Sequence, residues 1–291
     1  MRTRLESQLA APASRFRPLI VDDVCVGWLD DTRATRLLAH PDIFVVAARQ
    51  VGLVSTLTDR PSRTAAIDRV SRALSAEGLL SAWRDERYAV GAAWGAPALF
   101  EIERAAARYF GIHTFAAHVN GLCRIGSDIR MWIARRSEHK AIDPGLLDNL
   151  VGGGIAGGAS VQATVVKEAG EEAGIGPALA AQAVPAGTVH ICRDRPDGLQ
   201  RETIFVHDLW LPADFVPTPV DHEVSEFRQE PVAVAAILAT HHDGPDVVTA
   251  DASLVIVDCL IRHGVLPPDA PDLARLGALR YPALTPSRVA V

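Results

Sequence analysis

Three glutamates, Glu168, Glu171 and Glu172, are the residues of this chain best suited to chemistry. Residues spaced i, i+3 and i+4 lie on one face of an α-helix, so we expect the three carboxylates side by side. Like charges this close repel one another unless a cation lies among them, and an oxygen-only ligand set suits Mg²⁺ or Mn²⁺. A glutamate-rich helix face is more often a solvated surface, so the spacing alone does not decide between the two interpretations.

A run of five glycines between residues 152 and 158 precedes the glutamates. Glycine destabilises a helix by about 1 kcal/mol relative to alanine and favours loops, so the run predicts neither a helix interior nor a stable strand. From Ser160 the apolar spacing predicts a helix that Ser160 caps and Gly174 ends. The glycines also match G-x-G-x-x-G, but the preceding residues make a poor strand and no acidic residue follows at the expected distance, so a dinucleotide-binding fold is weakly indicated. The absence of G-K-[ST] excludes a P-loop.

The composition is that of a soluble globular protein with room for one large or two ordinary domains. The 291 residues are 48% hydrophobic and 22% charged. The 29 basic and 35 acidic residues give a net charge of −6, which argues against binding to a nucleic acid polymer. Four scattered cysteines without a C-x-x-C pair predict buried, reduced thiols and a cytoplasmic protein. No apolar run is long enough for a membrane span, and the first residues do not read as a signal peptide.

The stretch from Gly153 to Ile175 resembles the Nudix box, G-x5-E-x7-R-E-U-x-E-E-x-G-U, in which U is aliphatic. Its second half is matched at every specified position except Lys167, if Ala169 is accepted at the aliphatic position. Two departures stand out. Ala159 replaces the first glutamate, and Lys167 replaces an arginine whose planar fork a lysine cannot reproduce. On these residues the chain resembles the Nudix hydrolase superfamily.

The resemblance implies an α/β (α+β) fold in which a mixed β-sheet is sandwiched between helices. It also implies divalent metal-dependent hydrolysis of a small-molecule diphosphate, with Mg²⁺ or Mn²⁺ as the cofactor. The ion would screen the repulsion between a polyanionic substrate and the carboxylates and would acidify the attacking water. The residues that the resemblance assigns to the metal are Glu168, Glu171, Glu172 and a main-chain oxygen near Gly152 or Gly153. Those that it assigns to catalysis are Glu172, Glu171 and Lys167, and the choice of general base stays open.

A further metal ligand is expected from the acidic segment after Pro219. Nudix enzymes commonly recruit a glutamate from outside the box, and Glu223 is our choice, with Glu226 in reserve. The box carboxylates lie on one helix face, whereas a six-coordinate ion needs oxygens from other sides as well. The plain alternative is a solvated loop.

The similarity extends beyond the box to one branch of the superfamily. The segment ARRSEHKAIDPGLLDNLVGGG resembles the Nudix part of fungal thiamine pyrophosphokinase fusions and some plant plastid Nudix proteins, which also carry lysine at the position of Lys167. The branch implies an oxidised thiamine diphosphate (an oxo- or oxythiamine form) as substrate, which would be cleaved to the monophosphate. The substrate-binding residues expected on this similarity are Arg135, Arg136, Lys140 and Asn149.

Alternatives remain open at this stage. Other Nudix enzymes act on 8-oxo-dGDP, ADP-ribose or dinucleotides, and Ala159 would also fit a non-catalytic domain that binds its ligand without hydrolysing it. A third hypothesis is a scaffold whose N-terminal part does the work. The expected partner is a small-molecule diphosphate, with no nucleic acid polymer and no membrane, and a homodimer is left open.

Domain organisation is also suggested by the branch, whose members carry an N-terminal domain of unknown function. We expect a flexible tail at 1–14, a smaller N-terminal α+β domain at 15–120 and a Nudix domain at 121–291. The boundary is placed at Asn120-Gly121 because this dipeptide is the strongest β-hairpin signal in the chain.

The elements that must position these residues follow from the local patterns. Strands are expected before and after Asp22-Asp23 and over 87–90, 128–136, 188–193 and 203–210. Helices are expected over 32–39, 63–74 with a cap at Ser62, 97–109, 231–240 and 250–263. The three prolines in 211–219 predict a loop.

Overall fold

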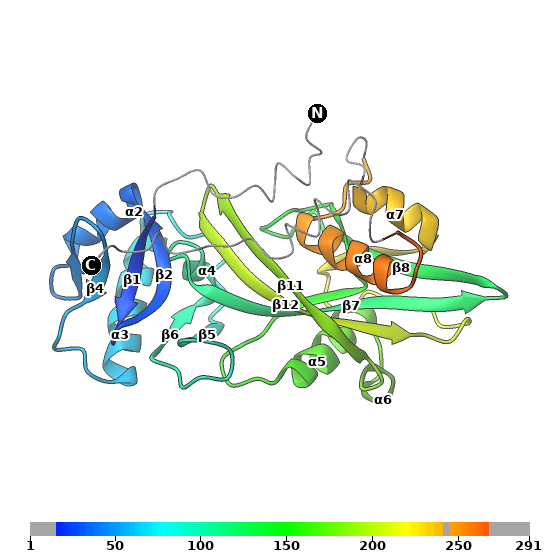
Figure 1. The fold of residues 1–291 in the computed structure, drawn as a ribbon, viewed down its shortest axis with the longest axis horizontal. Helices are drawn as coiled ribbons and strands as arrows, with labels where there is room; N and C mark the ends of the chain where they lie inside the picture. The colour runs from blue at the N-terminus through cyan, green and yellow to red at the C-terminus, as the bar shows by residue number, and fades with distance from the viewer. Residues whose placement is uncertain (1–15, 241–244, 268–291) are drawn as a thin grey trace.

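The computed structural model describes residues 16–240 and 245–267, so the tail expected at 1–14 lies outside the described residues. Figure 1 shows a smaller N-terminal part at one end and a long, twisted β-sheet with helices on both faces at the other. Three groups of buried apolar side chains correspond to the N-terminal part and to the two faces of the large sheet.

The N-terminal part is an α+β unit built on a four-stranded sheet with the order β2-β1-β4-β3. Asp22 and Asp23 both adopt positive φ in the tight turn between β1 and β2, as that dipeptide predicts. Its elements are β1 (Phe16–Val21), β2 (Val24–Asp30), α2 (Asp31–Arg36), η1 (Leu37–Ala39), β3 (Phe44–Val46), β4 (Val51–Leu53), α3 (Arg60–Ala76), β5 (Arg87–Val90), β6 (Phe100–Glu103) and α4 (Arg104–Ala107).

Two expectations for this part are wrong. The helix expected over 97–109 is strand β6 followed by the single turn α4. The apolar Phe100 and Ile102 alternate with two glutamates, and the segment pairs antiparallel with β5. Helix α3 begins earlier than expected. Its N-cap is Asp59, and Ser62 is the third residue of a capping box with Asp59 rather than the cap itself.

The larger part is a seven-stranded mixed sheet whose main order is β11-β12-β7-β8-β13, with β10 added to β7 and β9 to β8. Helices α5 and α6 cover one face, and α7 and α8 cover the other (Figure 1). Its elements are β7 (His113–Ile125), β8 (Asp128–Arg136), β9 (Leu147–Asp148), β10 (Val151–Gly154), α5 (Val161–Ala173), α6 (Pro177–Ala180), β11 (Val184–Arg195), β12 (Gly198–Trp210), β13 (Val224–Pro231), α7 (Val232–Thr240) and α8 (Ala250–Arg262).

The hairpin expected at Asn120-Gly121 is wrong, because β7 runs through both residues and turns only at Gly126. Asn120 is 1% exposed, and its side chain bonds to Asp208 and Asn149 instead of shaping a turn. Gly121 is required by a close approach, since a Cβ there would lie 2.3 Å from the Leu150 side chain. The expected domain boundary at 120 therefore falls inside a strand.

The glycine run is not entirely a loop. Val151–Gly154 forms strand β10, which pairs antiparallel with residues 116–119 of β7. The pairing partner compensates for the poor strand propensity of glycine. The space that side chains would fill is occupied by three neighbouring side chains, which are His118 at Gly152, Glu168 at Gly153 and Tyr88 at Gly154.

The expected fold class is confirmed: the chain is an α+β protein in which a mixed sheet lies between helices, preceded by a smaller α+β domain. All four cysteines are free, but Cys25 is exposed, which corrects the expectation of four buried thiols. Within the described ranges, none of the helices has the length and apolar character that a membrane crossing requires.

Candidate active site

The three glutamates of helix α5 differ in how deeply they are buried. Ser160 caps its start by accepting a hydrogen bond from the Ala163 N–H, and Gly174 ends it in the left-handed conformation (φ +65°), as the sequence predicts. Glu172 points into the protein and is 6% exposed, Glu168 is partly covered, and the Glu171 side chain is half exposed. The carboxylates thus form a cluster that reaches from the core to solvent.

Glu172 is fixed by the glycine strand. Its carboxylate accepts a hydrogen bond of 2.9 Å from the Gly152 N–H at the edge of β10. Burial raises the pKa of Glu172 to about 8, although the Gly152 N–H and the charge of Lys140 act in the opposite direction. The ionised form of this carboxylate therefore needs more positive charge around it than the described residues supply.

Lys167 holds the other two carboxylates. Its ammonium lies 3.0 Å from Glu168 and 2.7 Å from Glu171, so one lysine contacts both of its acidic neighbours. Burial raises the pKa of Glu168 above its usual range despite the lysine. Its carboxylate group also packs directly over Gly153, where a Cβ would lie 2.4 Å from the Glu168 Cδ.

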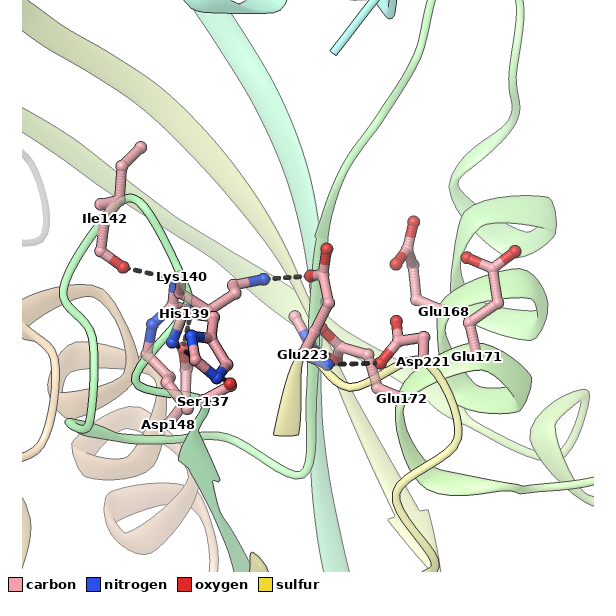
Figure 2. A network of polar contacts seen from close by, with 12 residues as sticks. Ser137, His139, Lys140, Ile142, Asp148, Glu168, Glu171, Glu172, Asp221 and Glu223 are labelled. Atoms are coloured by element: carbon pink, nitrogen blue, oxygen red, sulfur yellow. Dashed lines mark hydrogen bonds and ion pairs between the residues drawn. The ribbon is translucent and has the colours of Figure 1, made fainter. Parts of the chain in front are cut away.

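Glu223 approaches the cluster from the segment before β13. In Figure 2 its side chain lies between Lys140 and the glutamates of α5. It forms an ion pair with Lys140 and accepts a 3.0 Å hydrogen bond from Arg84 of the N-terminal part. Burial alone would raise the pKa of Glu223, but these two cations lower it below its usual value. Lys140 contacts Glu223, and its charge also acts to lower the pKa of Glu172.

Glu226 lies elsewhere. It belongs to strand β13 rather than to a loop, and its exposed carboxylate pairs with Arg135 at 2.8 Å. Of the two glutamates expected to extend the metal site, the structure brings Glu223 toward α5 and turns Glu226 to an outer ion pair.

A cavity of about 170 Å³ lies next to these carboxylates, between the two parts of the chain. The larger part contributes residues of β10, of β7 and of the loop segment 140–143. The N-terminal part contributes Ser81, Ala82, Arg84, Tyr88 and residues of α4. Arg136 and Lys140 line the cavity, as expected of substrate-binding residues, and Arg136 is held by Asp148 at 2.8 Å.

The other two expected substrate-binding residues do not line this cavity. Arg135 is tied to Glu226 and Asp246 and donates to the Gly145 carbonyl. Asn149 is 2% exposed. It accepts a hydrogen bond from His118 Nδ1 at 2.8 Å and donates one to Asn120, so it supports His118, whose ring does line the cavity.

Sequence reasoning missed Arg84, Tyr88 and His118. Arg84 and Tyr88 precede or begin β5 in the N-terminal part, whose role no motif indicates, and His118 is a single histidine in a strand. No motif surrounds His118 in the sequence, and its position opposite Gly152 follows only from the pairing of β7 with β10.

The donor set fits a divalent cation. All candidate ligands are carboxylate or main-chain oxygens, which suit Mg²⁺ or Mn²⁺, and burial raises the pKa of two of the carboxylates. A cation among them would offset that burial. The carboxylate cluster lies on a helix that follows a glycine-rich segment, and this helix packs on a mixed sheet between two layers of helices. This is the arrangement expected of a Nudix hydrolase.

Comparisons with known proteins agree with this class. A family model described as NUDIX domain matches residues 115–251, and one described as a domain of unknown function (DUF4743) matches residues 3–114. Nudix hydrolase 24, chloroplastic, of Arabidopsis thaliana is 39% identical over 88% of this chain and 70% of the relative. Nudix hydrolase 20, chloroplastic, of the same plant is 36% identical over the same shares. The crystal structure of DR0079 from Deinococcus radiodurans matches 49% of this chain and 80% of its own with 23% identity and a TM-score of 0.37. The chain belongs to the Nudix hydrolase family.

Proposed function

We propose that this protein is a metal-dependent pyrophosphohydrolase whose substrate is an oxidised thiamine diphosphate, which it converts to the monophosphate and inorganic phosphate. The observation that carries the proposal is the buried Glu172 carboxylate, which accepts a hydrogen bond from Gly152, a residue of the cavity wall. The thiamine-type substrate rests on the similarity of residues 134–154 to the thiamine pyrophosphokinase-fusion branch. Cytoplasmic location stays a prediction.

The residues have distinct tasks in this mechanism. Glu168, Glu172 and Glu223 would hold the divalent ion, with Glu171 on the solvent side. The ion supplies Lewis acidity and screens the negative charge of the substrate. Lys167 keeps Glu168 and Glu171 in position.

The cations of the cavity wall would bind the diphosphate. Arg84 and Lys140 both pair with the single carboxylate of Glu223, so these three side chains together carry one net positive charge. A water oxygen attacks one phosphorus atom and the bridging P–O bond breaks, which leaves a phosphate monoester and inorganic phosphate. Glu172 is our choice for the group that takes the proton from this water, because its carboxylate is held in one orientation.

The test is a hydrolysis screen with Mg²⁺ and Mn²⁺ over oxythiamine diphosphate, 8-oxo-dGDP and ADP-ribose. Inorganic phosphate is measured for the first two substrates, and AMP is measured for ADP-ribose. We expect turnover only with metal, and the highest kcat/KM for oxythiamine diphosphate. Glu172→Gln should reduce kcat on the order of 100-fold or more. Glu223→Gln should raise the metal concentration needed for half-maximal rate, whereas Glu226→Gln should change neither quantity.

Each part of the proposal is tested by a different outcome. No turnover of any diphosphate with either metal would contradict the activity. A preference for 8-oxo-dGDP or ADP-ribose would contradict only the thiamine-type substrate. Equal effects of Glu223→Gln and Glu226→Gln would remove Glu223 from the metal site.

A further inference from the structure

A second cavity, of about 300 Å³, lies at the start of the box helix. Its walls are the loop 91–98 between β5 and β6, the first residues of β7, and the segment 155–159 that joins β10 to α5. This volume is at the lower end of the range of small-molecule pockets, about 300–1,000 Å³. Neither the box nor the proposed function assigns a role to this cavity.

Aromatic rings gather on one side of this cavity. The Trp94 ring centroid lies 4.9 Å from that of Phe115 and 5.1 Å from that of Phe205. The His113 ring lies tilted against Phe115, with 4.7 Å between the centroids. Trp94, His113 and Phe115 line the cavity, and Phe205 lies on the neighbouring strand beneath them. These spacings are those of favourable aromatic contacts.

Trp94 is presented to the cavity in an unusual way. It lies in the loop sequence GAAWGA, in which every other side chain is small or absent, and it is 43% exposed. A tryptophan that served only the core would be covered. Here the indole contacts two phenylalanine rings, while a large part of the side chain stays exposed.

The charges at this cavity favour a neutral or weakly polar ring. Among the described residues that line it there is no carboxylate, and the one arginine, Arg60, is paired with Glu101 at 2.6 Å. Burial lowers the pKa of His113 to about 4, so its ring is neutral at physiological pH. Ala159 also lines the cavity, at the position where the Nudix box has a glutamate. Alanine there keeps a carboxylate out of the aromatic site.

The cavity adjoins the active site. Tyr88 and Thr114 line both this cavity and the one beside Lys140. Gly153, which contacts Glu168, and Gly157, which lines the aromatic cavity, are four residues apart and hence at most about 14 Å. An extended diphosphate ester can bridge this distance.

We propose that the aromatic cavity binds the planar aromatic group of the diphosphate substrate, and that the N-terminal domain recognises this group through Trp94. The proposal rests on the proposed function for the diphosphate part. It gives the N-terminal domain a role in substrate choice and accounts for the alanine at position 159 without a loss of catalysis.

The kinetic test compares the full-length protein with Trp94→Ala and Trp94→Phe. Oxythiamine diphosphate and ADP-ribose serve as aromatic substrates, and isopentenyl diphosphate as an aliphatic one. For the aromatic substrates we expect Trp94→Ala to raise KM about tenfold, equivalent to about 1.4 kcal/mol, with kcat little changed. Trp94→Phe should stay within about threefold of the native KM, because a ring remains for stacking. The matched control is Trp210→Ala, which removes another partly exposed tryptophan at the far end of β12.

A binding test keeps this proposal separate from the proposed function. Oxythiamine and adenosine carry no phosphate, so calorimetry with them measures binding of the ring alone. Both should bind to the native protein and to Trp210→Ala. Their affinity for Trp94→Ala should be at least tenfold lower. Ring binding without any diphosphate turnover would leave the aromatic site standing while the proposed function falls. The aromatic site would be overturned by unchanged aromatic KM values and ring affinity in Trp94→Ala, or by an equal loss for isopentenyl diphosphate.

Discussion

At the scale of single residues, the site depends on what the glycines of β10 leave room for. Each of Gly152, Gly153 and Gly154 lies against a side chain that lines the cavity or belongs to the carboxylate cluster. The glycines are therefore needed for the close approach of these side chains. Gly153 bears most directly on the carboxylate cluster, because the group that it admits is the Glu168 carboxylate.

Gly153→Ala tests this interpretation. The new Cβ would lie 2.4 Å from the Glu168 Cδ, so the carboxylate must move while the rest of α5 stays in place. Because a displacement of about 1 Å at a reacting group costs on the order of 100-fold in rate, we expect kcat/KM to fall by that order with the circular dichroism spectrum unchanged. Gly176→Ala is the matched control, since a Cβ there meets nothing within 4 Å. A Gly153→Ala enzyme as active as Gly176→Ala would show that the position of Glu168 is not critical.

The sequence predicts the residues of the site that lie on one element. The spacing of Glu168, Glu171 and Glu172 follows from helix geometry, and the caps of α5 follow from Ser160 and Gly174. Contacts between segments far apart in the chain carry no such pattern. The ion pair of Glu223 with Arg84 joins residues 139 positions apart, and only the fold brings them together.

At the scale of elements, the two main errors have one cause. In both segments the tertiary neighbours override the local sequence pattern. The segment 97–109 has apolar residues at helical spacing, but β5 offers a strand edge that Phe100–Glu103 completes. Asn120-Gly121 has the composition of a turn, but Asn120 is a member of a buried polar chain that tolerates no turn there. Strands whose alternation or turn was clear in the sequence, such as β1, β2 and β8, are as expected.

That buried polar chain joins the sheet to α8. Asn120 links Asn149 to Asp208, and Asp208 is bound by Arg262 through two hydrogen bonds of 2.6 and 2.9 Å and by His263 at 2.8 Å. Burial alone would raise the pKa of Asp208, but these donors lower it to about 2. The ligand atoms of Asp208, Cys259 and His263 lie close enough together to hold a metal ion, but the Asp208 carboxylate already accepts hydrogen bonds from protein donors.

Asp208→Asn should lower the free energy of unfolding by about 1.5–3 kcal/mol at pH 7, the range for hydrogen bonds to a charged group. Since the pKa is lower in the folded than in the unfolded chain, the stabilisation is complete above about pH 4 and is lost as the pH falls toward 2. The difference from the native protein should be equal at pH 7 and pH 5 and smaller at pH 3, measured by urea unfolding. The exposed Asp214→Asn serves as the control. A difference that grows on acidification would contradict this account.

At the scale of the whole molecule, the two parts are joined by main-chain contacts around the active site. The Gly157 N–H donates to the Arg87 carbonyl at 2.8 Å, and the Leu199 N–H donates to the Arg108 carbonyl at 3.0 Å. The two family models meet between residues 114 and 115, near the start of β7. We therefore propose a boundary just before β7 rather than at 120. The same contacts bring Arg84 and Trp94 to the two cavities.

These contacts predict that the two parts unfold together. Gly198 is the most sensitive point of the junction, because it has φ +142° and a Cβ there would lie 2.0 Å from the Arg108 carbonyl oxygen. Gly187 has φ +123° with nothing within 4 Å, so Gly187→Ala introduces the backbone strain, of order 1–3 kcal/mol, without the clash. We expect Gly198→Ala to lower stability by more than Gly187→Ala. Calorimetry should give a single transition for the native protein, and hydrogen exchange in α3 and α8 should then report the same global opening. Two separate heat-capacity peaks, with Gly198→Ala moving only one of them, would show that the domains are independent and that Trp94 and Arg84 are held at the cavities by little more than their own side-chain contacts.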